Sequence, residues 1–261
     1  MEVEKERGPK RQSRQERILS RLRALQGELT VEQLAETFSV SPLTIRRDLD
    51  ELERGGMILR THGGCVLRTS MESSYHRRAA LSFELKEAIG RAAAAELDGA
   101  TTILINDGST TFHLATQLHG RTRLTVYTNS IAMVRELARF PDIRIFVLGG
   151  EFDRDLSLLG GQLTEQVVES LCFDVVFLGA DAIDPTGACQ VATFGEGRLT
   201  QVMLRRGRRK VLLADHTKCQ AQGHATYARL ADFDLWITTP GIPEALRQEF
   251  QKLVKIKEAS L

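Results

Sequence analysis

Two short helical patterns lie only two residues apart near the start of the chain. The first begins at Thr30-Val31-Glu32-Gln33, which has the spacing of a capping box, and continues with apolar residues to Phe38. The second begins at Ser41, a good N-cap residue, with Pro42 at the first helical position, where a missing N–H costs nothing. Because only residues 39–40 remain for a turn, the two patterns predict a helix-turn-helix.

The second helix carries apolar and charged residues on opposite sides. Ile45, Leu49 and Leu52 recur at i, i+4 and i+7 and predict a buried stripe. The outward side consists of Leu43, Arg47, Asp50 and Arg54, flanked by Thr44 and Arg46. In a helix-turn-helix the second helix enters the major groove of DNA and the first crosses the backbone. We therefore expect the outward side of this helix to contact a duplex.

A third helix and a hairpin complete the first fold. An amphipathic pattern from about Arg14 to Gln26 predicts a helix that packs on the other two. After the helix-breaking Gly55-Gly56, the segment 57–68 predicts a β-hairpin, or wing. Arg60 and His62 lie on or near this hairpin, where they can reach phosphates or a minor groove. Each of the two is explained equally well as a solvated charge on a surface hairpin.

Positive charge gathers at the start of a chain that is nearly neutral as a whole. The 261 residues contain 35 lysines and arginines against 34 acidic residues, a formal net charge of +1. Residues 1–24 carry eight basic and four acidic side chains. Cations clustered beside a duplex neutralise phosphates and release counterions. We therefore expect a basic arm before the first helix, of which residues 1–12 are better described as a frayed terminus.

From about residue 80 the pattern changes to apolar runs that alternate with helical stretches. The runs that predict strands are 102–105, 124–127, 143–148, 174–178, 211–214 and 235–238. Near-continuous apolar runs suit strands covered on both faces, so we expect a doubly wound, mostly parallel α/β sheet. The predicted organisation is a winged helix-turn-helix domain at 13–68, a linker at 69–80 and an α/β domain at 81–255.

Small and polar residues follow the predicted strands, where open parallel sheets bind ligands. Gly108-Ser109-Thr110-Thr111 stands at the start of a helix, where free N–H groups and the helix dipole favour an anion. Such a string by itself is more often a plain turn and helix cap. Together with Lys218 and two further loops at the same edge of the sheet, it favours a phosphate site.

Metal, cofactor and membrane chemistry are not indicated by the sequence. The histidines lack His-Glu-x-x-His spacing, and Cys65, Cys172, Cys189 and Cys219 are far apart, so we expect neither a metal nor a cofactor. Free thiols fit a reducing cytoplasm. No apolar run approaches the ~20 residues of a membrane-spanning helix, and the charged start is not a secretory signal. We expect a cytoplasmic protein that does not contact a membrane.

The first part of the chain resembles the winged-helix domain of DeoR-type bacterial transcriptional repressors. The resemblance runs from Arg14 through Thr44-Ile45-Arg46-Arg47-Asp48-Leu49 to Arg60-Thr61-His62-Gly63-Gly64. Agreement over about fifty residues is far more specific than two arginines on a short helix. It implies that the partner is double-stranded operator DNA. The residues expected to contact DNA are Ser41, Leu43, Thr44, Arg46, Arg47, Arg60 and His62.

Nearly all of residues 80–240 resemble the DeoR effector domain, which is similar in fold to ribose-phosphate isomerases. The resemblance implies a sensor of a phosphorylated sugar. It implies that Asp107, Gly108, Ser109, Thr110 and Thr111 hold the phosphate, that Asn129 and Gly149 line the pocket, that Asp181 meets sugar hydroxyls and that Lys218 supplies a cation. Asn106-Asp107 stands where the family usually has Asp-Ser, and Thr200 stands where a lysine is common. The identity of the bound sugar therefore stays open.

Together these patterns favour a transcriptional regulator, a repressor of a sugar-metabolism operon whose operator affinity changes when the effector binds. A homo-oligomer is expected, because symmetric proteins read paired half-sites. An isomerase is the main alternative, since Asp107, Asp181, Asp184, Glu196, Asp215 and Lys218 supply acids and bases. The recognition helix weighs against an enzyme. A structural nucleoid protein, the third possibility, would bind DNA regardless of sequence and metabolites.

Overall fold

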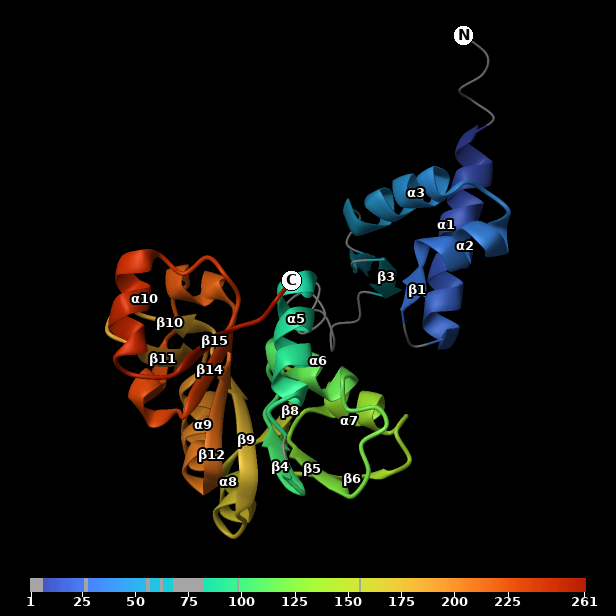
Figure 1. Ribbon diagram of the computed structural model, residues 1–261. Coiled ribbons are helices and arrows are strands. Elements are labelled where there is room, and N and C mark those ends of the chain that lie inside the picture. Colours follow the sequence, from blue (N-terminus) through green and yellow to red (C-terminus); the bar gives the residue numbers. More distant parts are fainter. Residues whose placement is uncertain are drawn as a thin grey trace. The chain divides into compact units, whose positions relative to one another are not determined.

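The chain divides into two compact units, Met1–Leu81 and Ser82–Leu261 (Figure 1). The computed structural model describes residues 7–25, 28–54, 57–61, 63–67, 82–97, 99–154 and 156–261. The predicted linker 69–80 and the wing residue His62 lie outside the described residues.

The first unit consists of three helices and a small antiparallel sheet. The helices are α1 (Arg7–Leu25), α2 (Val31–Phe38) and α3 (Pro42–Arg54), and the strands are β1 (Leu29–Thr30), β2 (Ile58–Arg60) and β3 (Gly64–Leu67). The strands pair in the order β1-β3-β2. One core joins all three helices to the sheet and contains the fully buried Ile18, Leu22, Leu34, Ile45 and Leu49. The predicted winged helix-turn-helix is confirmed.

Local hydrogen bonds hold the turn between α2 and α3. Thr30 Oγ1 accepts from the backbone N–H of Gln33 at 3.1 Å, and the Gln33 side chain accepts from the N–H of Thr30 at 2.9 Å. Ser39 ends α2 in the left-handed region, with φ 51°. Ser41 Oγ accepts from the N–H of Thr44 at 3.2 Å and so caps α3. The capping box and the N-cap read from the sequence are both formed.

Two details of the first unit differ from the prediction. α1 begins at Arg7, within the segment 1–12 that we expected to be frayed. This segment is rich in straight-chain residues that favour a helix, and each residue added to an existing helix gains a hydrogen bond. The two-residue strand β1 was not foreseen, because Leu29 and Thr30 become a strand only by pairing with Cys65 and Gly64 of the wing.

A seven-stranded parallel sheet forms the centre of the second unit. In spatial order its strands are β15 (Ile256–Glu258), β14 (Leu235–Thr238), β12 (Gly207–Leu213), β9 (Phe173–Gly179), β4 (Thr102–Ile105), β5 (Leu124–Thr128) and β6 (Ile143–Val147). All six predicted runs lie in this sheet. From β4 the chain moves outward to β6, and from β9 it moves outward in the other direction to β15. The strand order therefore reverses between β4 and β9.

Helices cover both faces of the parallel sheet. One face carries α5 (Phe83–Ala94), α6 (Ser109–Thr116) and α7 (Ile131–Leu137), and the other carries α8 (Gln162–Glu169), α9 (Phe194–Arg206) and α10 (Glu244–Gln251). Alternate residues of β9 enter different cores: Val175 and Phe177 pack with the first set, Val176 and Leu178 with the second. Burial on both sides explains the near-continuous apolar runs. The doubly wound parallel sheet is confirmed.

Several short strands were not predicted. β7 (Glu151–Asp153) and β8 (Leu158–Gly160) form a hairpin. β10 (Ala182–Ile183), β11 (Ala188–Val191) and β13 (Ala225–Arg229) form a separate antiparallel sheet. The parallel sheet also continues past residue 255, where the predicted domain ends, because β15 pairs with β14. β7, β8 and β10 have only two or three residues, too few to show a period of two, so only their pairing partners define them.

Candidate DNA-binding surface and ligand cavity

The outward side of α3 is open to solvent and carries cations. Arg46 and Arg47 are exposed, and Leu43 is 59% exposed. Thr44 is half-buried, and its hydroxyl lies 2.9 Å from Ser41 Oγ. Thus four residues expected to contact DNA lie on the first two turns of α3, and a fifth, Ser41, caps the helix together with Thr44.

A buried ion pair fixes α3 on α1. Arg14 Nε donates to Asp48 Oδ2 at 2.5 Å, and Arg14 Nη2 donates to Asp48 Oδ1 at 3.1 Å. The Asp48 side chain is 1% exposed and that of Arg14 is 19% exposed. The two parallel bonds match the fork geometry that guanidinium and carboxylate groups favour. Arg14, counted in the predicted basic arm, therefore holds the recognition helix in place.

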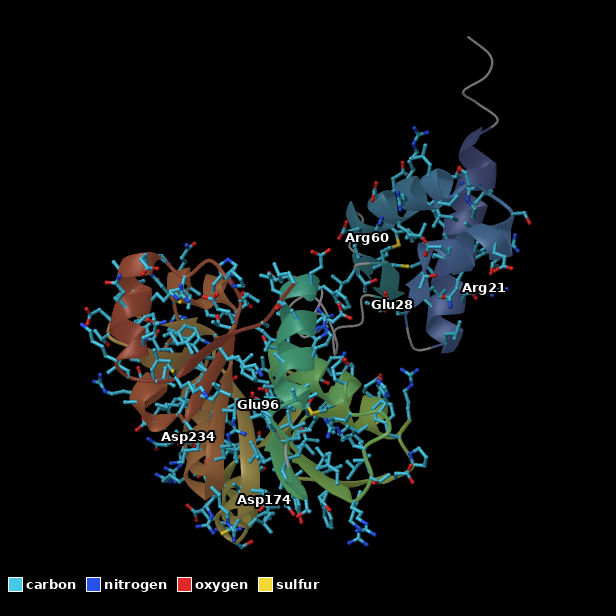
Figure 2. All side chains as sticks on the ribbon, in the orientation of Figure 1. Arg21, Glu28, Arg60, Glu96, Asp174 and Asp234 are labelled. Atoms are coloured by element: carbon cyan, nitrogen blue, oxygen red, sulfur yellow. The ribbon has the colours of Figure 1, made fainter. Side chains whose placement is uncertain are left out.

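The wing is attached to the rest of the first unit on two sides. On one side, the N–H of Val31 donates to the carbonyl of Gly63 at 2.8 Å, and the Thr61 hydroxyl donates to the Glu28 carboxylate. On the other side, Arg60 reaches α3, where Nη1 contacts Asp50 Oδ1 at 2.7 Å (Figure 2). The Arg60 side chain is 25% exposed. The wing therefore has a defined position against the recognition helix.

The second unit contains a cavity of about 450 Å³ beside the carboxyl ends of β4 and β5. β4 is one of the two strands at which the strand order reverses, the place where ligands of open α/β sheets bind. The β7–β8 hairpin and the start of α9 form the other walls. The lining residues are Asp107, Asn129, Glu151, Phe152, Asp153, Arg154, Leu156, Leu158, Gly160, Gly161, Thr193, Gly195, Glu196, Leu199 and Thr200.

Asn129 connects three walls of the cavity. Its Nδ2 donates to Asp107 Oδ1 at 3.2 Å and to the carbonyl of Leu159 at 3.1 Å. Both partners are acceptors, which fixes the amide orientation and leaves Oδ1 as the acceptor atom. Asn129 is fully buried, and its Oδ1 has no hydrogen-bond partner among the described residues. A buried acceptor without a donor costs about 1–3 kcal/mol, so a ligand hydroxyl at this atom is favourable.

The cavity combines carboxylates with helix N-termini. Its charged lining residues are Asp107, Glu151, Asp153, Glu196 and Arg154. Gly161 is the N-cap of α8 and Thr193 is the N-cap of α9, so two helix N-termini meet the cavity. Helix N-termini stabilise anions, and carboxylates accept hydrogen bonds from hydroxyls. The lining can therefore hold a ligand that has both an anionic group and hydroxyl groups.

The cavity brings together only Asp107 and Asn129 of the nine predicted effector residues. Gly108, Ser109, Thr110, Thr111, Gly149, Asp181 and Lys218 are not among its lining residues. Thr111 is buried and its hydroxyl donates to the carbonyls of Asn106 and Gly108, at 2.8 and 2.7 Å. The carbonyl of Gly149 accepts from the Thr164 hydroxyl at 2.7 Å. These two predicted positions stabilise the loops that surround the cavity.

Hydrogen bonds also hold the two strands where the order reverses. Asn106 Oδ1 accepts from the N–H of Gly179 at 3.2 Å, which joins the ends of β4 and β9. The Tyr227 hydroxyl donates to the carbonyl of Gly179 at 2.7 Å. Burial raises the pKa of Tyr227 well above its ordinary value, so the phenol stays a neutral donor. The edge of the sheet beside Asp107 is therefore rigid.

The sequence did not point to the hairpin residues of the cavity, and of its α9 residues it pointed only to Glu196, as an acid of the isomerase alternative, and to Thr200, where the family commonly has lysine. Glu151, Asp153 and Arg154 read as ordinary polar loop residues, because the hairpin that carries them was not recognised. Gly160-Gly161 before α8 was a usable signal, since paired glycines before a helix allow close approach to its N-terminus. Within the part of the chain that the structure describes, no group of three His, Cys, Asp or Glu side chains could hold a metal ion.

The two units define a class of protein. A winged helix-turn-helix with exposed arginines, in one chain with an α/β unit that contains a polar cavity, is typical of regulators that bind both DNA and a small ligand. The profile of the DeoR-like helix-turn-helix domain matches residues 14–71, and that of the DeoR C terminal sensor domain matches residues 82–239. The chain belongs to the DeoR family of transcriptional regulators.

Similar proteins are transcriptional regulators. The HTH-type transcriptional regulator GolR of Listeria innocua serovar 6a is 34% identical over 88% of this chain and 93% of its own length. The glycerol-3-phosphate regulon repressor of Escherichia coli K12 is 35% identical over 74% and 77%, respectively. The lactose phosphotransferase system repressor of Lactococcus lactis subsp. lactis is 29% identical over 94% and 98%. These relatives give no support to the isomerase alternative.

Solved structures with a likeness to this chain include ribose 5-phosphate isomerase A from Neisseria gonorrhoeae. It is 17% identical, with a TM-score of 0.38, over 53% of this chain and 54% of its own. RipA from Yersinia pestis is 14% identical, with a TM-score of 0.41, over 65% and 48%. Likenesses of this extent carry no argument about activity.

Across the described residues, no helix is both long and apolar enough to cross a membrane.

Proposed function

We propose that this protein represses a sugar-metabolism operon and that a phosphorylated sugar, bound in the cavity of the second unit, changes its affinity for operator DNA. Membership of the DeoR family supplies the regulator and the sensor domain. The relatives named for glycerol 3-phosphate and for a lactose phosphotransferase system support the choice of phosphorylated carbohydrates. The observation that carries the proposal is the cavity itself, with its helix N-termini and its hydroxyl-accepting groups.

The two ends of such a ligand match different parts of the lining. A phosphate is stabilised at the N-termini of α8 and α9, where Gly161 and Gly195 leave the backbone accessible, and Arg154 adds a positive charge. Sugar hydroxyls donate to Asn129 Oδ1 and to the carboxylate of Asp107. Gly108–Thr111 and Lys218, the predicted phosphate residues, stay candidates for a ligand that extends along the sheet edge.

Regulation requires that the ligand bind with different affinity to the DNA-competent and DNA-incompetent states. A coupling free energy of roughly 1–3 kcal/mol changes operator affinity about 5- to 150-fold. We propose that the protein acts as a homo-oligomer, because paired half-sites in an operator are matched by symmetric proteins.

Calorimetric titration of the full chain tests the ligand. The titrants are pentose, hexose and triose phosphates, each with its unphosphorylated counterpart. We expect at least one phosphorylated compound to bind, and its counterpart to bind at least tenfold more weakly. N129A removes the buried acceptor and should weaken binding about tenfold, while Q166A, at an exposed position on α8 outside the cavity, should leave binding unchanged. Absence of binding by every phosphorylated sugar would contradict the proposal.

The same variants test whether a ligand bound in the cavity changes the affinity for operator DNA. Operator affinity of the wild type should change when the bound sugar phosphate is added, and N129A should require a correspondingly higher concentration for the same change. Binding of the ligand without any change in operator affinity would leave the cavity as a binding site and refute its regulatory role.

A further inference from the structure

Arg60 of the wing uses its guanidinium group within the first unit. Its Nη1 contacts Asp50 Oδ1 at 2.7 Å and donates to the main-chain carbonyl of Arg46 at 3.3 Å. Both acceptors belong to α3, whereas Arg60 is the last residue of β2. The side chain therefore forms a direct link between the wing and the recognition helix.

The geometry of this link restricts how the wing can move. Arg46 and Asp50 are four residues apart, so they lie one above the other on the same flank of α3. Nη1 of the guanidinium group contacts the Arg46 carbonyl and Asp50 Oδ1, so these contacts fix the position of β2 along the axis of α3 as well as its position around the helix. The backbone bond from Val31 to Gly63 holds the opposite side of the wing. Without the Arg60 contacts, the wing keeps that bond and the packing of Ile58 and Cys65 in the core of the first unit, but it loses its side-chain link to the polar flank of α3.

Charge gives a reason for Arg60 to keep these contacts when DNA is bound. Asp50 lies on the outward side of α3 with Arg47, and its side chain is 57% exposed. A carboxylate beside DNA phosphates is repelled unless a cation accompanies it. If Arg60 left to contact a phosphate, it would give up two acceptors and leave Asp50 beside the duplex without that cation.

We propose that Arg60 is a positioning residue, which sets the wing against the recognition helix through Asp50 and the Arg46 carbonyl so that both elements meet the duplex in one geometry. Sequence reading placed Arg60 among the residues that contact DNA. As a positioning residue, Arg60 instead affects DNA binding through α3. Asp50 then contributes to sequence-specific DNA binding by holding Arg60, without itself contacting a base.

A positioning residue and a phosphate contact affect binding differently. Loss of a phosphate contact weakens binding about equally on every sequence and lowers the slope of log affinity against log salt by about one. Loss of a positioning contact weakens binding to the preferred sequence and leaves non-specific binding unchanged. The ratio of the two affinities therefore separates the two roles.

The experiment measures binding of the full chain to two duplexes by fluorescence anisotropy. One duplex is selected from random-sequence DNA with the wild-type protein, and the other is a scrambled duplex of the same composition. The variants are R60A, D50N and the double variant R60A/D50N. R144A, at an exposed arginine of the second unit, is the control for loss of one positive charge.

We expect R60A and D50N each to lower the specificity ratio about fivefold, the upper range for one exposed ion pair. The double variant should lose no more than R60A alone, because each change removes the same ion pair. In the double variant, which keeps the net charge of the wild type, the salt slope and the scrambled-duplex affinity should stay at wild-type values. D50N changes an exposed side chain, so it tests the proposal even if R60A impairs folding.

Three results would overturn the assignment. Equal losses of R60A on both duplexes, with a reduced salt slope, would make Arg60 a phosphate contact. Full specificity in D50N would show that the ion pair has no role in positioning the wing. Additive losses in the double variant would show that Arg60 and Asp50 act independently.

Discussion

Individual side chains decide how the recognition helix is presented. Ser41 and Thr44 start α3, Asp48 is turned inward, and Arg46 and Arg47 remain exposed. These five polar or charged positions thus serve different purposes within about two turns. We therefore expect that replacing a charged residue on the inner side of α3 destabilises the fold, and that replacing one on the outward side weakens DNA binding.

Replacing Arg14 by alanine should destabilise the first unit. The change removes the two hydrogen bonds that Arg14 donates to the buried Asp48 carboxylate, and breaking a buried ion pair in this way costs about 2–3 kcal/mol, less than for a fully buried partner. Hydrogen exchange of the core amides in α1 and α3 measures the loss. R21A, at an exposed position of the same helix, is the control and should change exchange little. Equal protection in R14A and R21A would contradict a structural role for the pair.

Replacing Arg47 by alanine should weaken operator binding while the fold stays intact. Arg47 is exposed on the outward side of α3, and one good contact between arginine and a base is worth about 1–3 kcal/mol at a single base position. Competition with single-base variants of the selected duplex locates that position. The exposed Arg144 of the second unit provides the charge control, R144A. Unchanged discrimination at every base would remove Arg47 from the base-reading surface.

At the level of elements, close backbone contact determines how α5 packs on α6. Gly90 lies in the middle of α5 and is buried. A Cβ built on Gly90 would be 2.4 Å from the carbonyl oxygen of His113 in α6. Glycine ordinarily weakens a helix interior, so its presence here reflects the short distance between the two helices.

Gly90→Ala should therefore destabilise the second unit, although alanine has the higher helix propensity. Forcing an atom against a neighbouring backbone costs typically 1–3 kcal/mol, which exceeds the propensity gain of about 1 kcal/mol. G195A is the matched control, because a Cβ on Gly195 in α9 meets no atom within 4 Å. Urea unfolding followed by the fluorescence of Trp236, a core residue of this unit, measures both variants. Greater stability in G90A than in wild type would show that α5 and α6 separate easily.

Across the whole second unit, carboxylates join elements that are far apart in sequence. Asp174 at the start of β9 accepts from the N–H groups of Thr101 and Thr102, each at 3.1 Å. Glu96, after α5, pairs with Arg209 of β12 and Lys257 of β15 (Figure 2). Because the partners of each carboxylate come from other strands, these bonds form only when the sheet is assembled.

These carboxylates make stability depend on acidic pH. The backbone N–H of Thr101 lowers the pKa of Asp174, and for Glu96 the bonds from Lys257 and Arg209 outweigh the effect of burial, so its pKa is also lowered. A carboxyl whose pKa is lower in the folded state stabilises the fold above its unfolded pKa of about 4, and this stabilisation is lost as pH falls through the folded pKa.

We therefore expect the melting temperature to fall steeply below about pH 4 and the fall to be smaller in D174N, which has no charge to lose. Calorimetric melting between pH 3 and pH 7 measures the difference. D142N, at an exposed aspartate, should follow the wild-type curve. Parallel curves for D174N and wild type would show that Asp174 does not contribute to acid lability.

Patterns that depend on neighbours in the chain could be read from the sequence alone. The capping box at Thr30, the N-cap at Ser41 and the apolar stripe of α3 are local, and so are the six apolar runs that became parallel strands. Caps and the spacing of apolar residues make these elements recognisable without knowledge of the partners that later bury them. The sequence therefore determined the fold class and the nature of the first unit, and its family resemblance pointed to the correct family.

Contacts between distant residues were decided only by the tertiary structure. Asp48 and Arg60 belong to motifs that are typical of DNA binding, and the structure shows that their side chains also contact the long-range partners Arg14 and Asp50. The cavity is formed where the β7–β8 hairpin and α9 meet the ends of β4 and β5, so it gathers residues from 107 to 200. No sequence period encodes such a meeting, because it depends on the path of the chain through the reversal between β4 and β9. The sequence by itself specified the helices of the first unit and six strands of the parallel sheet, whereas packing decided the short strands and which side chains are exposed, line the cavity or enter the core.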